Sequence, residues 1–216
     1  MTDTATLDGP RVAPTSGQPA KSLVILLHGY GSNGDDLISL APYWQSQLPD
    51  TAFVSPNAPQ HCPGAPGGYQ WWSLMDGGDR AAGANSAAPI LNAFIDAELA
   101  RHGLGEGKLA LVGFSQGTMM ALHVGPRRER PLAGIVGFSG MLVDEAGLAS
   151  SPTKPPVLLV HGDADPMVPV AAFHAAKTAL EQAGFPLISH ISPGLGHGID
   201  PAGLKLGAQF LRQVLD

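Results

Sequence analysis

Gly113-Phe114-Ser115-Gln116-Gly117 is the stretch on which the fold assignment rests. An apolar run of strand length, 108–112, precedes it, and residues 118–124 after it have the composition of a buried helix. A Gly-x-Ser-x-Gly motif between a strand and a helix is typical of a nucleophile elbow, a strained turn that exposes the serine hydroxyl at the amino end of the helix. The two glycines remove side chains that would collide with neighbouring backbone. This context predicts that Ser115 is a nucleophile, and the alternative is a chance match in a chain with 28 glycines.

Apolar runs of strand length alternate with helix-like segments along the rest of the chain. The run 22–27 is continuously apolar, which is typical of a strand buried on both faces of a parallel sheet. A helix is expected from Asp35 to about residue 44, despite Pro42, and another over 86–102, ended by Gly103. The alternation predicts an α/β fold with a mostly parallel central sheet flanked by helices and ligands at the carboxyl ends of the strands. Further strands are expected at 51–54, 132–138, 156–160 and 187–191, and further helices at 170–183 and 201–214.

Two segments lack this regularity. Residues 1–20 are polar and rich in Pro, Gly and Thr, so we expect a flexible N-terminal segment followed by one domain over 21–216. Residues 55–85 show no periodicity, and loops of this length are usually functional or disordered. Because an aromatic cluster lies at 69–72, we predict an ordered loop that borders a pocket.

The bulk composition excludes several classes of protein. A formal charge of −6 provides no basic face for nucleic acid. The N-terminus lacks the basic start and apolar centre of a signal peptide, and no run approaches the ~20 apolar residues of a membrane span. Cys62 is the single cysteine, so an internal disulfide is impossible. We therefore expect a cytoplasmic protein without stable membrane insertion.

A serine nucleophile needs a base, and histidine is the residue suited to this role near neutral pH. His197 follows the last expected strand, between two glycines and before the final helix, which places it at the same sheet edge as Ser115. His28 and His161 also follow strands, but each stands directly before a glycine, so we expect local hydrogen bonds that hold those turns. We therefore assign the base to His197. Structural or solvated roles are expected for His61, His102, His123, His174 and His190.

The imidazole in turn needs a carboxylate that fixes its tautomer. Asp165 follows the strand at 156–160, and Asp163 is the rival two residues earlier. Only one of the two can face His197, and Pro166 fixes the backbone directly after Asp165. We therefore assign the acid to Asp165, which gives the chain order Ser, Asp, His.

An oxyanion hole is expected from two main-chain N–H groups. One donor is the residue after the nucleophile, Gln116, and the other comes from the glycine-rich loop after the first strand, where we assign Tyr30. Loss of one such donor costs about 2.7–4 kcal/mol in the barrier. Because these donors belong to the main chain, substitutions of the two side chains are expected to matter less.

Five blocks of the chain, in this order, resemble the phospholipase/carboxylesterase family, which includes the acyl-protein thioesterases. The resemblance implies a compact α/β-hydrolase fold without a large cap domain. It also implies cleavage of esters and thioesters without a metal or cofactor, by Ser115, Asp165 and His197, with Tyr30 and Gln116 as oxyanion donors. The blocks are 26–31 (LLHGYG), 56–59 (PNAP), 113–117 (GFSQG), 161–169 (HGDADPMVP) and 196–197 (GH).

By the same resemblance, Trp71 and Trp72 line the acyl side of the cleft, where relatives have a Trp-Phe pair, and Leu142 is also assigned to the substrate site. Thr118-Met119 departs from the family, in which many members have another glycine after the elbow. The loop from Cys62 to Tyr69 is also long and rich in Gly and Pro. These departures leave the acyl-chain preference open.

The leading hypothesis is a serine carboxylesterase that acts on a small-molecule ester with a short to medium acyl chain, through an acyl-enzyme. The alternatives are an acyl-protein or acyl-CoA thioesterase or a lysophospholipase, and nothing favours amides. A hypothesis of another class is a non-catalytic binding protein with a hydrolase fold, which is disfavoured because no member of the Ser/Asp/His set is missing. A weak homodimer through the aromatic loop is also expected.

Overall fold

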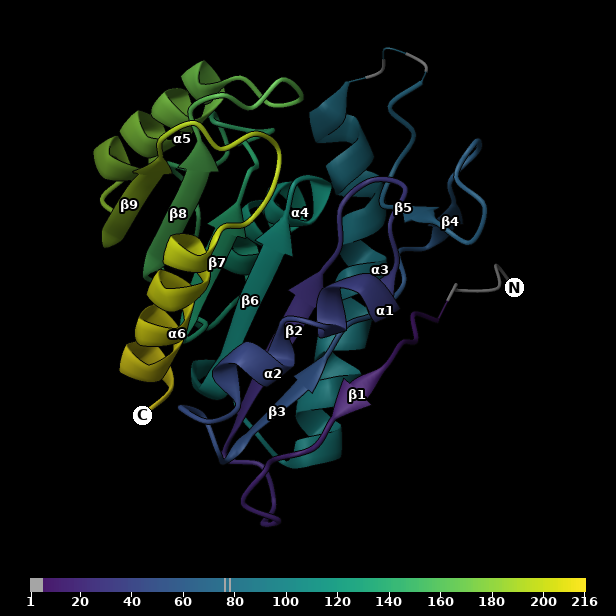
Figure 1. Cartoon of the computed structure of the whole chain (residues 1–216), viewed down its shortest axis with the longest axis vertical. Helices are drawn as coiled ribbons and strands as arrows, with labels where there is room; N and C mark the ends of the chain where they lie inside the picture. Colours follow the sequence, from purple (N-terminus) through teal and green to yellow (C-terminus); the bar gives the residue numbers. More distant parts are fainter. Residues whose placement is uncertain (1–5, 76, 78) are drawn as a thin grey trace.

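A seven-stranded sheet forms the centre of the computed structural model, which describes residues 6–75, 77 and 79–216 (Figure 1). The strand order is β1-β3-β2-β6-β7-β8-β9. All neighbouring strands are parallel except β1, which pairs antiparallel with β3. The expected mostly parallel sheet is therefore confirmed. The strands are β1 (Arg11–Val12), β2 (Ser22–Leu27), β3 (Thr51–Val54), β6 (Leu109–Phe114), β7 (Gly134–Phe138), β8 (Val157–Gly162) and β9 (Leu187–Ser192).

Helices cover both faces of this sheet (Figure 1). Side chains of β2 alternate between two core clusters: Leu23, Ile25 and Leu27 belong to one, and Val24 and Leu26 to the other. Both faces of β2 are buried, which explains why the sequence of 22–27 is a continuous apolar run. The first cluster is covered by α3 (Arg80–His102), α4 (Gln116–Val124) and α5 (Val170–Gln182), and the second by α1 (Gly34–Ile38), α2 (Ala41–Trp44) and α6 (Pro201–Leu215).

Two helices differ from their expected bounds. The helix expected from Asp35 to residue 44 is split into α1 and α2, because the ring of Pro42 clashes with the carbonyl four residues earlier, at Ile38, where α1 ends. Helix α3 begins at Arg80 instead of 86. The Asp79 carboxylate caps the helix by accepting a hydrogen bond from the Ala81 N–H at 2.8 Å. The first turn has no buried apolar stripe, so the apolar periodicity did not indicate that the helix begins here.

The segment 55–85 is ordered over its described residues and supports the loop after β2. Strands β4 (Gln60–His61) and β5 (Tyr69–Gln70) form a small antiparallel hairpin. Tyr69 bonds the loop twice: its carbonyl accepts from the Gly31 N–H at 2.9 Å, and its N–H donates to the Ser32 carbonyl at 2.7 Å. These bonds fix the position of the loop that follows β2.

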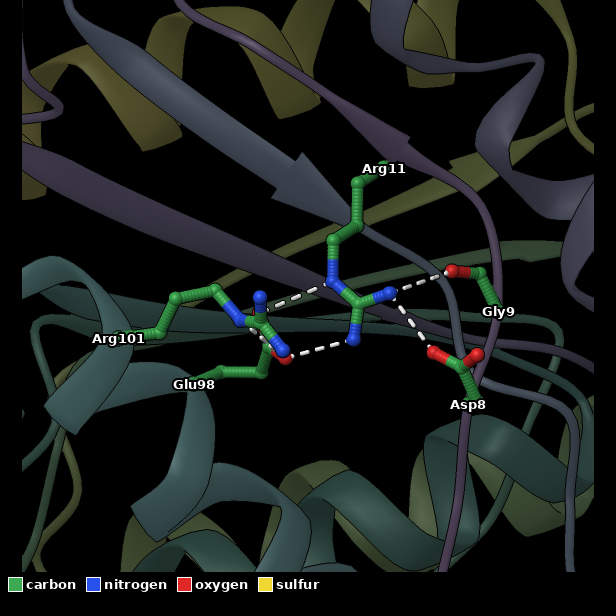
Figure 2. A network of polar contacts seen from close by, with 5 residues as sticks. All are labelled: Asp8, Gly9, Arg11, Glu98 and Arg101. Atoms are coloured by element: carbon green, nitrogen blue, oxygen red, sulfur yellow. Dashed lines mark hydrogen bonds and ion pairs between the residues drawn. The ribbon is translucent and has the colours of Figure 1, made fainter.

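The segment before β2 also contacts the sheet over its described residues. A network anchors β1 to helix α3 (Figure 2). The Arg11 guanidinium donates to both carboxylate oxygens of buried Glu98, at 2.7 and 3.3 Å, and to Asp8 at 2.7 Å, while Arg101 pairs with Glu98 at 3.2 Å. Loss of these partners would leave a buried, unpaired carboxylate, which would strongly destabilise the folded protein. Residues 8–12 are thus held at the sheet edge, which the composition of residues 1–20 did not indicate.

Candidate active site

The elbow has the predicted strand–turn–helix context. Ser115 lies between β6 and α4 with φ 53° and ψ −115°, a strained conformation for a residue other than glycine. A methyl group on Gly117 would lie 1.8 Å from the Leu27 carbonyl oxygen, and one on Gly113 would lie 2.3 Å from the Thr118 nitrogen. Both glycines are therefore required sterically, as the motif predicts. The Ser115 N–H donates to the Phe138 carbonyl at 2.9 Å, which ties the turn to β7.

His197 and Asp165 meet at the carboxyl edge of the sheet. The distance between His197 Nδ1 and Asp165 Oδ2 is 2.7 Å. The other carboxylate oxygen of Asp165 accepts from the N–H groups of Met167 and Val168 at 2.8 and 2.9 Å. Burial raises the pKa of Asp165, but the hydrogen bonds from His197 and from these two N–H groups outweigh it, so the pKa lies below its ordinary value. Asp165 is therefore an acceptor at neutral pH, and His197 carries its proton on Nδ1.

Asp163 does not contact His197. Its carboxylate accepts from the Gly194 N–H at 2.6 Å, within the turn that precedes the histidine loop. The structure thus brings Asp165, and not Asp163, to the imidazole.

Ser115 and His197 line one cavity of about 390 Å³. The Phe114 ring packs against the imidazole, with 4.9 Å between the ring centroids. Tyr30 and Gln116 also line this cavity. Its remaining wall is mainly apolar and includes Leu74, Met119, Met141, Met167, Val168 and Ala172.

The loop after β2 and the amino end of helix α4 both adjoin Ser115. The loop after β2 passes directly beside it, because a methyl group on Gly29 would lie 3.3 Å from Ser115 Cβ. The Gln116 N–H is the first of helix α4, so the helix offers it no carbonyl acceptor. The amino end of a helix also favours negative charge. The geometry therefore suits the binding of an oxyanion beside Ser115.

His28 and His161 hold turns, as predicted. His28 Nε2 accepts from the Ala58 N–H at 2.9 Å, so its Nδ1–H donates to the Gly29 carbonyl at 2.8 Å. Burial lowers the pKa of His28, which keeps this ring neutral. His161 Nε2 lies 2.8 Å from the Val168 carbonyl and donates to it. These bonds fix the loop after β2 and the loop that carries Asp165.

The structure corrects the assignment of Trp71, Trp72 and Leu142 to the substrate site. The three residues are 1%, 5% and 7% exposed, belong to the core and do not line the cavity. The Trp71 indole N–H donates to the His28 carbonyl at 3.0 Å, and Trp72 packs so closely under α3 that a methyl group on Gly83 would lie 2.4 Å from its ring. The aromatic pair therefore packs in the core beneath the loop after β2. Burial of the two apolar rings is more favourable than their exposure to solvent at the cleft.

The Gln116 side chain has a role that the sequence did not reveal. It is buried, its oxygen accepts from the Trp71 N–H at 2.9 Å, and its amide donates to the Trp72 carbonyl at 2.9 Å. The elbow is thereby joined to the aromatic segment. The one signal in the sequence was a polar side chain within a buried motif.

We expect Gln116→Ala to lower the free energy of unfolding by about 2–4 kcal/mol, because it leaves a buried N–H and a buried carbonyl unpaired. Urea denaturation of this variant beside Gln209→Ala, which removes an exposed glutamine of α6, measures the effect. Equal unfolding midpoints of the two variants would contradict a clamp between Gln116 and the aromatic segment.

The departure at Thr118-Met119 has two separate consequences. The Thr118 hydroxyl lies 2.8 Å from the carbonyls of Gly113 and Phe138, and its methyl group fills the space above Gly137, where a Cβ would lie 2.6 Å away. Thr118 therefore packs between β6 and β7 and does not alter the cavity. Met119 lines the cavity.

Ser139 is a second strained serine near the site. Its φ is 48°, it is buried, and its hydroxyl donates to the Gly198 carbonyl at 3.0 Å. Because Gly198 follows His197, this bond holds the histidine loop against the end of β7. In the sequence, Ser139 is distinguished only by its position directly after the strand expected at 132–138.

The described part of the chain offers neither a cluster of metal ligands nor a membrane-spanning helix. It contains no group of three or more His, Cys, Asp or Glu side chains placed to hold a metal ion. None of its helices combines the length and the apolar character that crossing a bilayer requires.

Comparison with known proteins agrees with this architecture. Acyl-protein thioesterase 1 of Kluyveromyces lactis is 31% identical, covering 97% of this chain and 98% of its own length. Esterase YpfH of Escherichia coli is 28% identical over 94% of this chain and 88% of its own. Among solved structures, esterase PE8 superposes with a TM-score of 0.93 at 48% identity, covering 97% of this chain and 100% of its own.

The sequence model of the phospholipase/carboxylesterase family matches residues 8–215. This match covers the sheet, the elbow and the histidine loop, and the superposed structures share the α/β-hydrolase fold. The chain therefore belongs to the phospholipase/carboxylesterase family.

Proposed function

We propose that this protein hydrolyses carboxylic esters of short to medium acyl chain through an acyl-enzyme on Ser115. The observation that carries the proposal is the strained elbow serine in one cavity with His197, whose Nδ1 lies 2.7 Å from a buried carboxylate. Membership of a family of esterases and thioesterases supports hydrolysis at an activated carbonyl.

Acylation begins with proton transfer from the Ser115 hydroxyl to His197 Nε2. Asp165 holds the proton on Nδ1, which leaves the Nε2 lone pair free to act as the base. The serine oxygen attacks the ester carbonyl, and its C=O bond opens to a tetrahedral oxyanion. The protonated imidazole then returns the proton to the leaving alcohol as the C–O bond breaks.

The oxyanion is bound by the N–H groups of Tyr30 and Gln116. Both residues line the cavity beside Ser115, and the amino end of α4 adds a favourable field. Water activated by the same histidine then attacks the acyl-enzyme, and the acid leaves as Ser115 regains its proton.

The cavity supports a preference for shorter acyl chains. Its volume is about 390 Å³, and Met119 and Met141 occupy its wall. Methionine side chains adapt to ligands of different shape, so a range of small acyl groups can be accommodated.

Hydrolysis of p-nitrophenyl esters from acetate to palmitate tests this preference. We expect kcat/KM to peak between butyrate and octanoate and to fall toward palmitate, because longer chains extend beyond the cavity. A maximum at palmitate would show an open acyl groove and contradict the proposed chain length.

A thioesterase is the second candidate, because the chain is similar to acyl-protein thioesterases over nearly its whole length. The same serine and oxyanion donors can attack a thioester carbonyl. Turnover of S-butyryl and O-butyryl substrates with matched leaving groups separates the two activities. A cytoplasmic location and a weak homodimer are further proposals that rest on the sequence alone.

A further inference from the structure

Arg80 is an exposed residue that also lines the cavity of the candidate active site. It is the first residue of α3 and lines the same cavity as Ser115 and His197. Among the described residues that line this cavity, Arg80 alone carries a permanent charge. The rest of the cavity wall is mainly apolar and includes Leu74, on the loop before α3, and Met141, which follows β7.

No carboxylate in the described part of the chain forms an ion pair with Arg80. The neighbouring Asp79 carboxylate caps α3 through the Ala81 N–H at 2.8 Å and does not line the cavity. Asp36 accepts a hydrogen bond from the Ser32 hydroxyl at 2.6 Å and does not line the cavity. The guanidinium is therefore available to a ligand in the cavity.

The negative net charge of the protein bears on the role of the Arg80 guanidinium. A formal charge of −6 repels anionic substrates at long range, so recognition of an anion requires a cation at the site itself. A guanidinium binds planar carboxylates and phosphates through two parallel hydrogen bonds. An apolar wall with one arginine fits an ester that carries an anionic group beyond a short hydrocarbon chain.

We propose that Arg80 is a specificity-determining residue that selects esters bearing a second, anionic oxygen group, a carboxylate or a phosphate, separated from the scissile carbonyl by a short apolar chain. This inference rests on the proposed ester hydrolysis at Ser115. It names the substrate class as half-esters of dicarboxylic acids or esters of phosphorylated hydroxy acids.

Two matched pairs of substrates test the inference. Monoethyl adipate against diethyl adipate examines a carboxylate, and ethyl 6-phosphonooxyhexanoate against ethyl 6-hydroxyhexanoate examines a phosphate at the end of a similar apolar chain. We expect Arg80→Gln to lower the anionic-to-neutral ratio of kcat/KM about tenfold for at least one pair, mainly through a higher KM for the anionic member. Arg80→Lys is expected to retain part of the ratio, since it keeps the charge without the bidentate geometry.

Arg212→Gln is the matched control. It makes the same change of charge at an exposed position of α6, which packs on the other face of the sheet from α3, and it is expected to leave both ratios unchanged. The larger of the two shifts in Arg80→Gln identifies whether a carboxylate or a phosphate is preferred.

Equal ratios in wild type and Arg80→Gln for both pairs, with neutral esters still turned over, would overturn the inference about Arg80 alone. An equal shift in Arg212→Gln would overturn it as well, because the effect would then come from total charge. Failure of wild-type protein to hydrolyse any of the four esters would instead contradict the proposed function.

Discussion

Asp165→Asn is expected to lower kcat about 10⁴-fold, the loss that follows when a catalytic histidine is held in the wrong tautomer. The reason lies in the hydrogen bonds of the two carboxylate oxygens. One accepts from the N–H groups of Met167 and Val168, so in the variant the amide oxygen keeps that position. The NH₂ group then faces His197 Nδ1, which becomes an acceptor. The ring proton moves to Nε2, and the base toward Ser115 is lost.

Asp163→Asn is the control for that variant. Asp163 lies two residues away, and its oxygen accepts from the Gly194 N–H, a bond that an asparagine oxygen can keep. We expect its kcat on p-nitrophenyl butyrate to stay within about twofold of wild type. Similar losses in the two variants, at equal thermal stability, would contradict the assignment of Asp165 to the histidine.

Ser115→Ala is expected to reduce kcat about 10⁶-fold, to the level at which binding and the oxyanion donors alone remain. Its backbone is held by the bond from the Ser115 N–H to the Phe138 carbonyl and by the glycines on either side of the elbow. The variant is therefore expected to fold, with thermal unfolding close to that of wild type. Steady-state hydrolysis of p-nitrophenyl butyrate measures the loss.

Ser139→Ala provides a matched comparison, because Ser139 also has a positive φ and lies near the same sheet edge. Its hydroxyl donates to the Gly198 carbonyl, so its removal loosens the loop of His197 without removing a reacting atom. The loss of one such bond is expected to lower kcat about 2- to 10-fold. If Ser139→Ala lowered kcat as much as Ser115→Ala does, the result would contradict the assignment of the nucleophile to Ser115.

The sheet and the chemical groups at its edge were predictable from local patterns. Strands β2, β6 and β8 contain runs of buried apolar residues, and Ser115, Asp165 and His197 come shortly after the ends of β6, β8 and β9. Parallel strands bring these ends together, so position along the chain was enough to place the three residues at one edge. The turn roles of His28 and His161 followed from the same pattern, since each precedes a glycine.

Contacts between distant segments were not predictable. Trp71 and Trp72 look like cleft residues in an irregular segment, yet they pack inward because His28, Gln116 and α3 offer partners far along the chain. The position of β1 depends in the same way on Arg11 and Glu98, which are 87 residues apart. Arg80 lay within what read as an irregular loop, so its position at the cavity required the structure.

Labelling with a fluorophosphonate tests most directly whether Ser115 is the nucleophile of a serine hydrolase. Peptide mass spectrometry after reaction with the probe identifies the modified residue. We predict one phosphonyl group per chain, on Ser115, with rapid labelling in wild type and Asp163→Asn, much slower labelling in Asp165→Asn and none in Ser115→Ala. A folded wild-type protein that stays unlabelled, or that carries the label on another residue, would contradict the account.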